Sequence, residues 1–282
     1  MTDQTFYLFR VTLHDKRQSD LYDKRTLRSD VLRQLLFSHP KAHGWGGKIW
    51  TVGNVEELPG ASLYFRFGRA SKRQLPVQDE KGDFLDADIS IAPYSHCLIH
   101  LDLQILAMTY NGNLSQSIAS QGKSLQTVLS SALRDFKNFD AIEVRQLPDP
   151  REFVKKIREA FSVSRFWIKV RRPNPFDVDS HFIKPISRLN DAVGGNEVKV
   201  GMSGDDLDKE VIENIATNTA LQGSDGAAYV RPEKDTRGEI VPIKKTMLKF
   251  SMEFDQSREG KETVRKRISF LYENLLSPPR NE

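Results

Sequence analysis

Apolar and polar residues alternate at the start of the chain, a pattern typical of a β-strand. In such a strand Tyr7, Phe9, Val11 and Leu13 point to one side, which is well suited to burial. Over residues 26–38 the apolar spacing changes to that of an amphipathic helix, because leucines and valines recur every three or four positions. The chain therefore opens with a strand followed by a helix.

The polar segment 69–87 interrupts the patterned part of the first half. It contains Pro76 and Gly82, and it shows no apolar period, so a long surface loop is predicted there. The segments on either side are patterned as short strands and one helix. The predicted strands cover residues 49–52, 62–68 and, with a break, 96–110, and the helix covers residues 124–136.

The second half of the chain alternates strand and helix patterns. Asp149 is expected to cap a helix in which Pro150 takes the first position and Glu152 completes a capping box. The last helix is stopped by Pro278 and Pro279. Predicted strands cover residues 141–146, 166–171, 197–201, 228–230 and 247–254, and predicted helices cover residues 151–161, 205–217 and 261–276, with one more ending near residue 192.

The charge pattern and the apolar rhythm both change near residues 137–140. We place a domain boundary there, which gives an N-terminal α+β lobe, residues 1–138, and a basic C-terminal α+β lobe, residues 139–282. The predicted fold class is α+β, with two lobes that each hold a mixed or antiparallel sheet and helices packed on it.

The composition is that of a globular protein. The 282 residues are 38% hydrophobic and 28% charged, which is ordinary for a globular chain. The longest apolar run, residues 97–110, is interrupted by His100, Asp102 and Gln104, so it falls short of the ~20 apolar residues that a membrane helix needs. With no secretory signal pattern and one cysteine, Cys97, we expect a cytoplasmic protein without membrane insertion, in which Cys97 is a small buried residue.

Charge is distributed in blocks. The net charge is +4, but residues 141–190 hold 11 Lys/Arg against 6 Asp/Glu, whereas residues 191–240 hold 5 against 11. A basic block is typical of a phosphate-binding face, and it is equally typical of a solvated surface. The placement of the cations on predicted elements is therefore more informative than their number.

Two neighbouring elements of the basic block place cations on one face. On the helix over residues 151–161, Arg151, Lys155 and Arg158 lie opposite the apolar stripe. On the next strand, Trp167 alternates with buried positions, as do Lys169 and Arg171, and Arg172 extends the row. An aromatic side chain between cations can stack a base and neutralise phosphates. Alternatively, Trp167 packs under a helix, and the long basic stems surround it.

A second basic group contains Lys244 and Lys245, with Lys261, Arg265, Lys266 and Arg267 on the last helix. No helix-turn-helix, zinc-finger or RNA-recognition motif accompanies either group, so sequence-independent binding is predicted. The predicted nucleic-acid-binding residues are Arg151, Lys155, Arg158, Trp167, Lys169, Arg171, Arg172, Lys244 and Lys245.

Other functions are supported by fewer residues. Glu197 and Lys199 on a predicted strand, with Asp179 upstream, have the outline of a metal-dependent nuclease that would use Mg²⁺. The acidic stretch 205–213 instead favours a protein-interaction subunit, in which it docks a basic partner or masks the basic face. No pattern is specific enough to name a reaction, so we expect a binding protein without a cofactor or metal rather than an enzyme.

The order of features also resembles a known family. An early strand with Phe6-Tyr7, a Lys/Arg-rich connection and a leucine-rich helix precede Lys48-Ile49-Trp50 and the segment 63–67, and a basic half ending in a basic helix follows. This order resembles the RexA-like phage-exclusion proteins of lambdoid prophages and is loosely similar to the KwaB component of the Kiwa antiphage system. The resemblance implies a homodimer that binds double-stranded DNA without sequence preference in antiviral defence, with a partner protein. It covers most of the chain but contains no diagnostic motif, so no functional residue is transferred.

Overall fold

The computed structural model describes residues 2–15, 28–44, 48–78, 80–136, 138–171, 183–193, 195 and 197–276. Within these residues every pairing between strands is antiparallel, and the strands form two sheets with helices packed on them. The predicted α+β class is thus confirmed. No helix in this part of the chain is long and apolar enough to cross a membrane.

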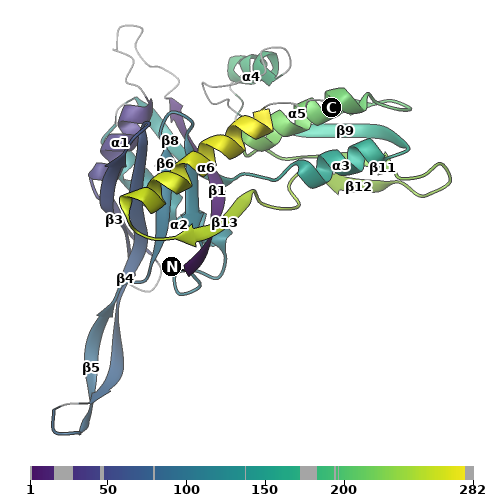
Figure 1. The fold of residues 1–282 in the computed structure, drawn as a ribbon. Helices are drawn as coiled ribbons and strands as arrows, with labels where there is room; N and C mark the ends of the chain where they lie inside the picture. The colour runs from purple at the N-terminus through teal and green to yellow at the C-terminus, as the bar shows by residue number, and fades with distance from the viewer. Residues whose placement is uncertain are drawn as a thin grey trace.

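The larger sheet has the strand order β13-β1-β7-β6-β4-β3-β2, with β8 paired to β1 and β5 paired to β4 (Figure 1). The long first strand is central because it pairs with β7 along one edge and with β13 and then β8 along the other. The strands are β1 (Thr2–Asp15), β2 (Lys41–His43), β3 (Ile49–Leu58), β4 (Ser62–Gln78), β5 (Phe84–Ile91), β6 (Tyr94–His100), β7 (Ile105–Thr109), β8 (Phe139–Gln146) and β13 (Lys249–Phe254).

Helices bury both faces of this sheet, although the alternation in β1 predicted one buried face. Phe9 and Leu13 join the core formed with α1 and α2, whereas Phe6 and Leu8 join a second core formed with α6. In Figure 1 α6 runs across the sheet toward α5. The three helices on this sheet are α1 (Arg28–Phe37), α2 (Ile118–Leu133) and α6 (Arg258–Leu276).

The smaller sheet has the order β10-β9-β11-β12. Its inner face carries Phe166 and Ile168, which pack against Phe153 and Ile157 of α3 and against Ile212 of α5. The elements of this part are α3 (Arg151–Glu159), β9 (Ser162–Arg171), α4 (Ile183–Ala192), β10 (Glu197–Ser203), α5 (Lys209–Leu221), β11 (Gly226–Arg231) and β12 (Glu239–Pro242).

The smaller sheet is inserted between β8 and β13. The chain leaves the large sheet and returns to it through two segments that pair with each other at Pro148 and Met247. The N–H of Asp149 donates to the carbonyl of Thr246 at 3.0 Å beside this bridge. β8 and β13, which both follow residue 138, pair with β1 in the large sheet. The domain boundary near residue 138 stays a prediction.

A buried arginine joins the two sheets. Arg10 of β1 is 3% exposed, and its Nε and Nη2 both donate to the carbonyl of Leu221 at the end of α5, at 3.0 and 2.5 Å. Its Nη1 donates to the carbonyl of Leu103, and its guanidinium lies 5.5 Å from the centre of the Tyr272 ring on α6. Gly223 follows α5 with φ +66°, a left-handed conformation that favours glycine, and the backbone there lies close to the side chain of Arg10.

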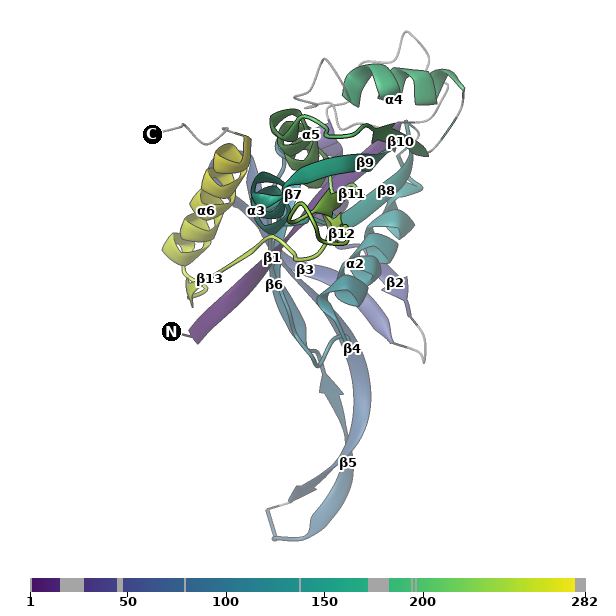
Figure 2. The ribbon, with the colours of Figure 1, turned by 90° about the vertical axis from the view of Figure 1, so that its right-hand side faces the viewer.

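The polar segment 69–87 is not a loop, so that prediction was wrong. β4 continues to Gln78 and pairs with β5 from Ser71↔Ile91 to Gln78↔Phe84. The resulting hairpin projects from the large sheet (Figure 2). Residues 80–86 are exposed, and a hairpin without a core against it needs no apolar alternation, which is why its pattern resembled a loop. Pro76 is tolerated because one edge of each strand in a two-stranded ribbon is open.

Replacing Arg10 with methionine should destabilise the fold strongly. The substitution keeps the apolar stem but leaves the carbonyls of Leu221 and Leu103 without their donor, at about 1–3 kcal/mol for each buried acceptor. Urea unfolding of the variant should therefore show a loss of several kcal/mol. The exposed Arg33, which pairs with Glu57, is the matched control, and Arg33→Met should lose about 0–1 kcal/mol. Equal losses would mean that Arg10 does not join the sheets.

His96 should make the fold sensitive to acid. Burial, assisted by the charges of Arg66 and Lys261, lowers the pKa of His96 from 6.5 to about 4. Between those two values the unfolded chain binds a proton that the folded chain excludes, so the free energy of unfolding should fall as pH falls from 6.5 toward 4. In His96→Gln this part of the pH dependence should disappear in urea unfolding at several pH values. An unchanged slope would contradict the assignment.

Candidate nucleic-acid interface

The cations predicted on α3 lie against carboxylates. Each pair is solvent-exposed on its basic side, so it stabilises the fold by only ~0–1 kcal/mol, but the carboxylates offset the positive potential of this surface. The acidic partners of these cations are a feature that the helical pattern did not predict. The ion pairs join Arg151 to Asp149 at 2.5 Å, Lys155 to Glu159 at 3.9 Å, Arg158 to Glu213 at 2.8 Å and Lys156 to Glu239 at 2.8 Å.

The start of α3 differs from its predicted capping box. Pro150 occupies the N-cap position, and the Oδ1 of Asp149 accepts from the N–H of Arg151 at 3.1 Å. Glu152 pairs with Lys245 instead of turning back to the cap. Lys245, like the cations of α3, is thus balanced by an acid of the same chain.

The second predicted basic group is divided by the fold. Lys244 is exposed in the turn before β13. Lys261, by contrast, is 7% exposed, pairs with Glu56 at 2.5 Å and lies 4.4 Å from the centre of the Tyr64 ring. Lys261 is thus part of the contact between α6 and the large sheet. It does not form one continuous exposed surface with Lys244.

The alternation predicted for β9 is confirmed. Phe166, Ile168 and Val170 are buried against the helices, while Trp167 and Lys169 point to the opposite, outer face of the small sheet. Because α3 and α5 lie on the inner face, Trp167 does not pack under either of them. Arg171 ends β9, but its side chain, and Arg172 and Asp179 altogether, fall outside the described residues.

Trp167 lies between two small residues on this outer face. Gly201 of β10 is its partner on one side, and Ala227 of β11 is its partner on the other. A Cβ at Gly201 would meet no atom within 4 Å, so space is open beside the indole. The Nζ of Lys199 lies 4.4 Å from the centre of the ring. Lys199 thus covers part of the indole, and Trp167 is partly buried.

Arg165 and Tyr229 extend the outer face by one row. They are partners between β9 and β11, both are exposed, and Ile240 of β12 lies beyond Tyr229. Neither residue was predicted. Arg165 is two positions before Trp167, so the alternation would have found it had the strand been started earlier than residue 166. Tyr229 lies between the buried Ala228 and Val230, so the alternation of buried and exposed positions could also have indicated Tyr229, although in a shorter strand.

The outer face is basic overall. Arg165, Lys169 and Lys199 contribute three cations, and Glu197, which lies 3.2 Å from Lys169, contributes one carboxylate. Cations and aromatic rings therefore share this face over the three neighbouring strands β10, β9 and β11. We call this surface, made of Arg165, Trp167, Lys169, Lys199, Gly201 and Tyr229, the sheet face.

Of the residues of the nuclease alternative, Glu197 and Lys199 fall within the described part of the chain and Asp179 does not. Glu197 is engaged with Lys169, and the ammonium of Lys199 lies over Trp167. Within the part of the chain that the structure describes, no three His, Cys, Asp or Glu side chains gather as a metal site would require. Cys97 is buried in the large sheet, as predicted.

Comparison with known proteins provides no family for this chain. No family model matches it, and no curated protein matches it at a significant level. The resemblance to RexA-like proteins therefore stays a prediction, together with the antiviral role, the homodimer and the partner protein that it implies.

Filling the space beside Trp167 should not harm the fold. Gly201→Val adds a Cβ that would meet no atom within 4 Å, and it removes the ~0.5–1 kcal/mol that glycine costs in a strand. Thermal unfolding should show equal or higher stability. Gly226→Val is the contrast, because a Cβ there would lie 2.7 Å from the carbonyl oxygen of Trp167 and 2.8 Å from Ile243. Destabilisation by both substitutions would contradict the open space at Gly201.

Proposed function

We propose that this protein binds nucleic acid without sequence preference through the sheet face. The observation that carries the proposal is Trp167, an aromatic side chain between two residues too small to cover it, on a surface where cations outnumber carboxylates. Base stacking on such a ring contributes ~1–3 kcal/mol per base and tolerates every base, because each has a π face.

The cations of the sheet face supply the second half of the interaction. Arg165 and Lys199 lie on either side of Trp167 along the strands, at the places where the phosphates flanking a stacked base would pass. Lys199 covers the indole in the free protein. When a base takes its place on the ring, the flexible lysine can move to a phosphate. The ammonium then exchanges its contact with the indole for a contact with the phosphate. Contacts to phosphates and ring faces do not read base edges, which gives sequence independence.

A single strand suits this geometry better than a duplex. Bases in a duplex are stacked on each other, whereas unpaired bases can turn out onto an aromatic platform. Double-stranded DNA, the ligand that the family resemblance implies, is therefore expected to bind more weakly at this face.

Three of the five carboxylates in the acidic stretch of the interaction-subunit alternative make contacts within this chain. The Oδ1 of Asp206 accepts from the N–H of Val163 at 2.9 Å, and Asp208 caps α5 by accepting from the N–H of Val211 at 3.1 Å. Glu213 holds Arg158. These carboxylates support the fold of this chain, and only the Glu213–Arg158 pair corresponds to the masking that the alternative predicted.

Fluorescence anisotropy with labelled random-sequence single-stranded DNA tests the proposal. Gly201→Val should weaken binding about tenfold, because its side chain takes the space beside Trp167 that a stacked base would use. Gly53→Val on β3 is the matched control, since a Cβ there also meets no atom within 4 Å, and it should bind like the wild type. No binding by the wild type at low salt, or an equal loss in both variants, would overturn the proposal.

The salt dependence of the same binding should identify the cations involved. Lys199→Gln should reduce the slope of log K against log salt by ~0.7, the value for one phosphate of a single strand. Lys155→Gln on α3 should leave the slope unchanged, because Lys155 lies against Glu159 away from the sheet face. The opposite ranking would place the interface on α3. Mg²⁺-dependent cleavage of the probe that is lost in Glu197→Ala would favour the nuclease alternative instead.

A further inference from the structure

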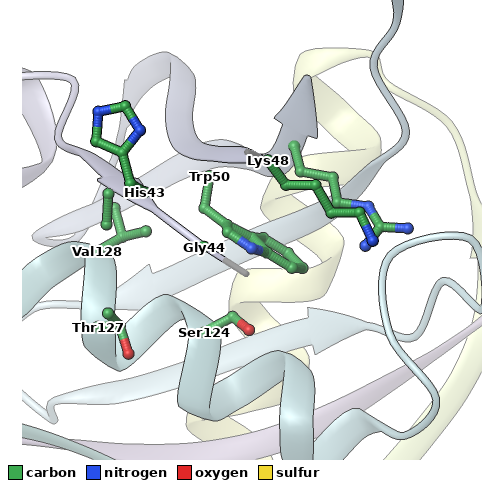
Figure 3. A pocket seen from close by; sticks show the side chains of 9 residues that line it. His43, Gly44, Lys48, Trp50, Ser124, Thr127 and Val128 are labelled. Carbon is green, nitrogen blue, oxygen red and sulfur yellow. The ribbon is translucent and has the colours of Figure 1, made fainter. Parts of the chain in front are cut away.

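A pocket of about 280 Å³ lies at the β2 edge of the large sheet, apart from the sheet face. It opens between α2 and the strands β2, β3 and β4, and its polar lining comes from both sides (Figure 3). Its volume is close to the lower end of the ~300–1,000 Å³ usual for small-molecule sites, so it admits one small ligand. The polar and aromatic side chains that line it are those of His43, Lys48, Trp50, Arg69, Ser124 and Thr127.

Trp50 is held rigidly at the centre of this pocket. Its ring stacks on Phe67 with the centroids 5.2 Å apart and the planes 18° from parallel, and Phe67 is fully buried in the core. Gly44 touches the indole edge, since a Cβ there would lie 2.7 Å from Trp50 Nε1. The N–H of Gly44 also donates to the carbonyl of Lys48 at 2.7 Å, which fixes the backbone on which Lys48 stands.

The charge of the pocket is positive. Lys48 and Arg69 line it, His43 lies on the other side of Trp50 in Figure 3, and none of the lining residues is a carboxylate. Arg69 is oriented by its Nη2, which donates to the carbonyl of Asn113 at 2.7 Å, and its guanidinium lies 5.6 Å from the centre of the Trp50 ring. Its Nε is buried and has no hydrogen-bond partner within the described residues. The guanidinium, held in this orientation beside Trp50, suits an anion.

The hydroxyl groups on α2 add a different chemistry. Ser124 and Thr127 each donate to a carbonyl one turn earlier, Ser120 at 3.1 Å and Lys123 at 3.0 Å. Because their protons are used in this way, they offer lone pairs and accept hydrogen bonds from a ligand. The pocket thus combines cations for an anionic group, an aromatic ring and acceptors for amino or hydroxyl groups.

We propose that this pocket binds a free nucleoside monophosphate. Its phosphate would lie between Lys48 and Arg69, its base would lie against the indole of Trp50, and Ser124 and Thr127 would accept from the sugar hydroxyls or an exocyclic amino group. A simple anion would use only the cations and leave the ring and the hydroxyls without a role. The proposal is independent of nucleic-acid binding at the sheet face, because the two sites share no residue.

Isothermal titration calorimetry with AMP, GMP, CMP and UMP tests the proposal on the full chain. At least one nucleotide should bind at least tenfold more tightly than both inorganic phosphate and the corresponding nucleoside, since each of these provides only part of the interactions. Binding by none of the four, or equal affinity for phosphate alone, would overturn it. Tighter binding of a 5′-phosphorylated oligonucleotide than of any free nucleotide would also overturn it, because the ligand would then be a strand end.

Two variants connect that binding to the pocket. Lys48→Gln should weaken nucleotide binding about tenfold or more, because it removes a charge-assisted contact to the phosphate. Lys41→Gln, which changes an exposed lysine of β2 that does not line the pocket, should bind like the wild type. Thr127→Val, which removes only the hydroxyl, should weaken nucleotide but not phosphate binding. An unchanged affinity in Lys48→Gln contradicts the site, and Gly201→Val should leave nucleotide affinity unchanged, which separates the two sites.

Discussion

The buried charge of Arg10 is the constraint on which the arrangement of the two sheets depends. A guanidinium that is 3% exposed must have its donors paired, and the structure pairs them with carbonyls of two distant turns. One of these carbonyls ends α5, where the helix dipole is negative and favours a cation. The central strand of the large sheet is thereby fixed to the helix that covers the inner face of the small sheet. The opposite face of the small sheet is the one that we propose binds nucleic acid.

The distribution of charge follows from the same packing. Cations on the helices of the smaller part meet carboxylates of neighbouring elements, as Arg158 meets Glu213 and Lys156 meets Glu239. On the outer face of the sheet the neighbours across the strands are glycine, alanine, tyrosine and further cations, together with Glu197, which pairs with Lys169. A basic block in the sequence thus separates into a balanced helical surface and a positive sheet surface. The second combines its charge with the partly exposed Trp167 and the exposed Tyr229.

Much of the fold could be predicted from local pattern. The alternation in β1 and in β9, the leucine stripe of α1 and the break between β6 and β7 all correspond to elements of the structure. The hairpin of β4 and β5 could not be predicted, since strands that have no core against them lack the apolar period. The pairing of β8 and β13 with β1 could not be predicted either, because pairing between distant segments leaves no local signal.

The sequence predicted only part of the candidate site, because the rest of it also depends on pairing between distant segments. Trp167 and Lys169 were found because one strand displays them, whereas the contribution of Lys199, Gly201 and Tyr229 depends on which strands are neighbours. The ion pairs of Arg158 with Glu213 and of Lys156 with Glu239 join residues 55 and 83 positions apart in the sequence. The local pattern of α3 therefore does not indicate that these cations have acidic partners. Helical spacing predicts which side chains share a face, but not what lies against that face.

Ultraviolet crosslinking of the protein to an oligonucleotide of thymidines, followed by mass spectrometry of the peptides, tests the central claim most directly. If the sheet face is the interface, the crosslinked peptides should include Trp167 on β9 or Tyr229 on β11, and Gly201→Val should reduce their yield while Gly53→Val does not. Crosslinks confined to α3 or α6, with β9 and β11 unmodified, would contradict the account.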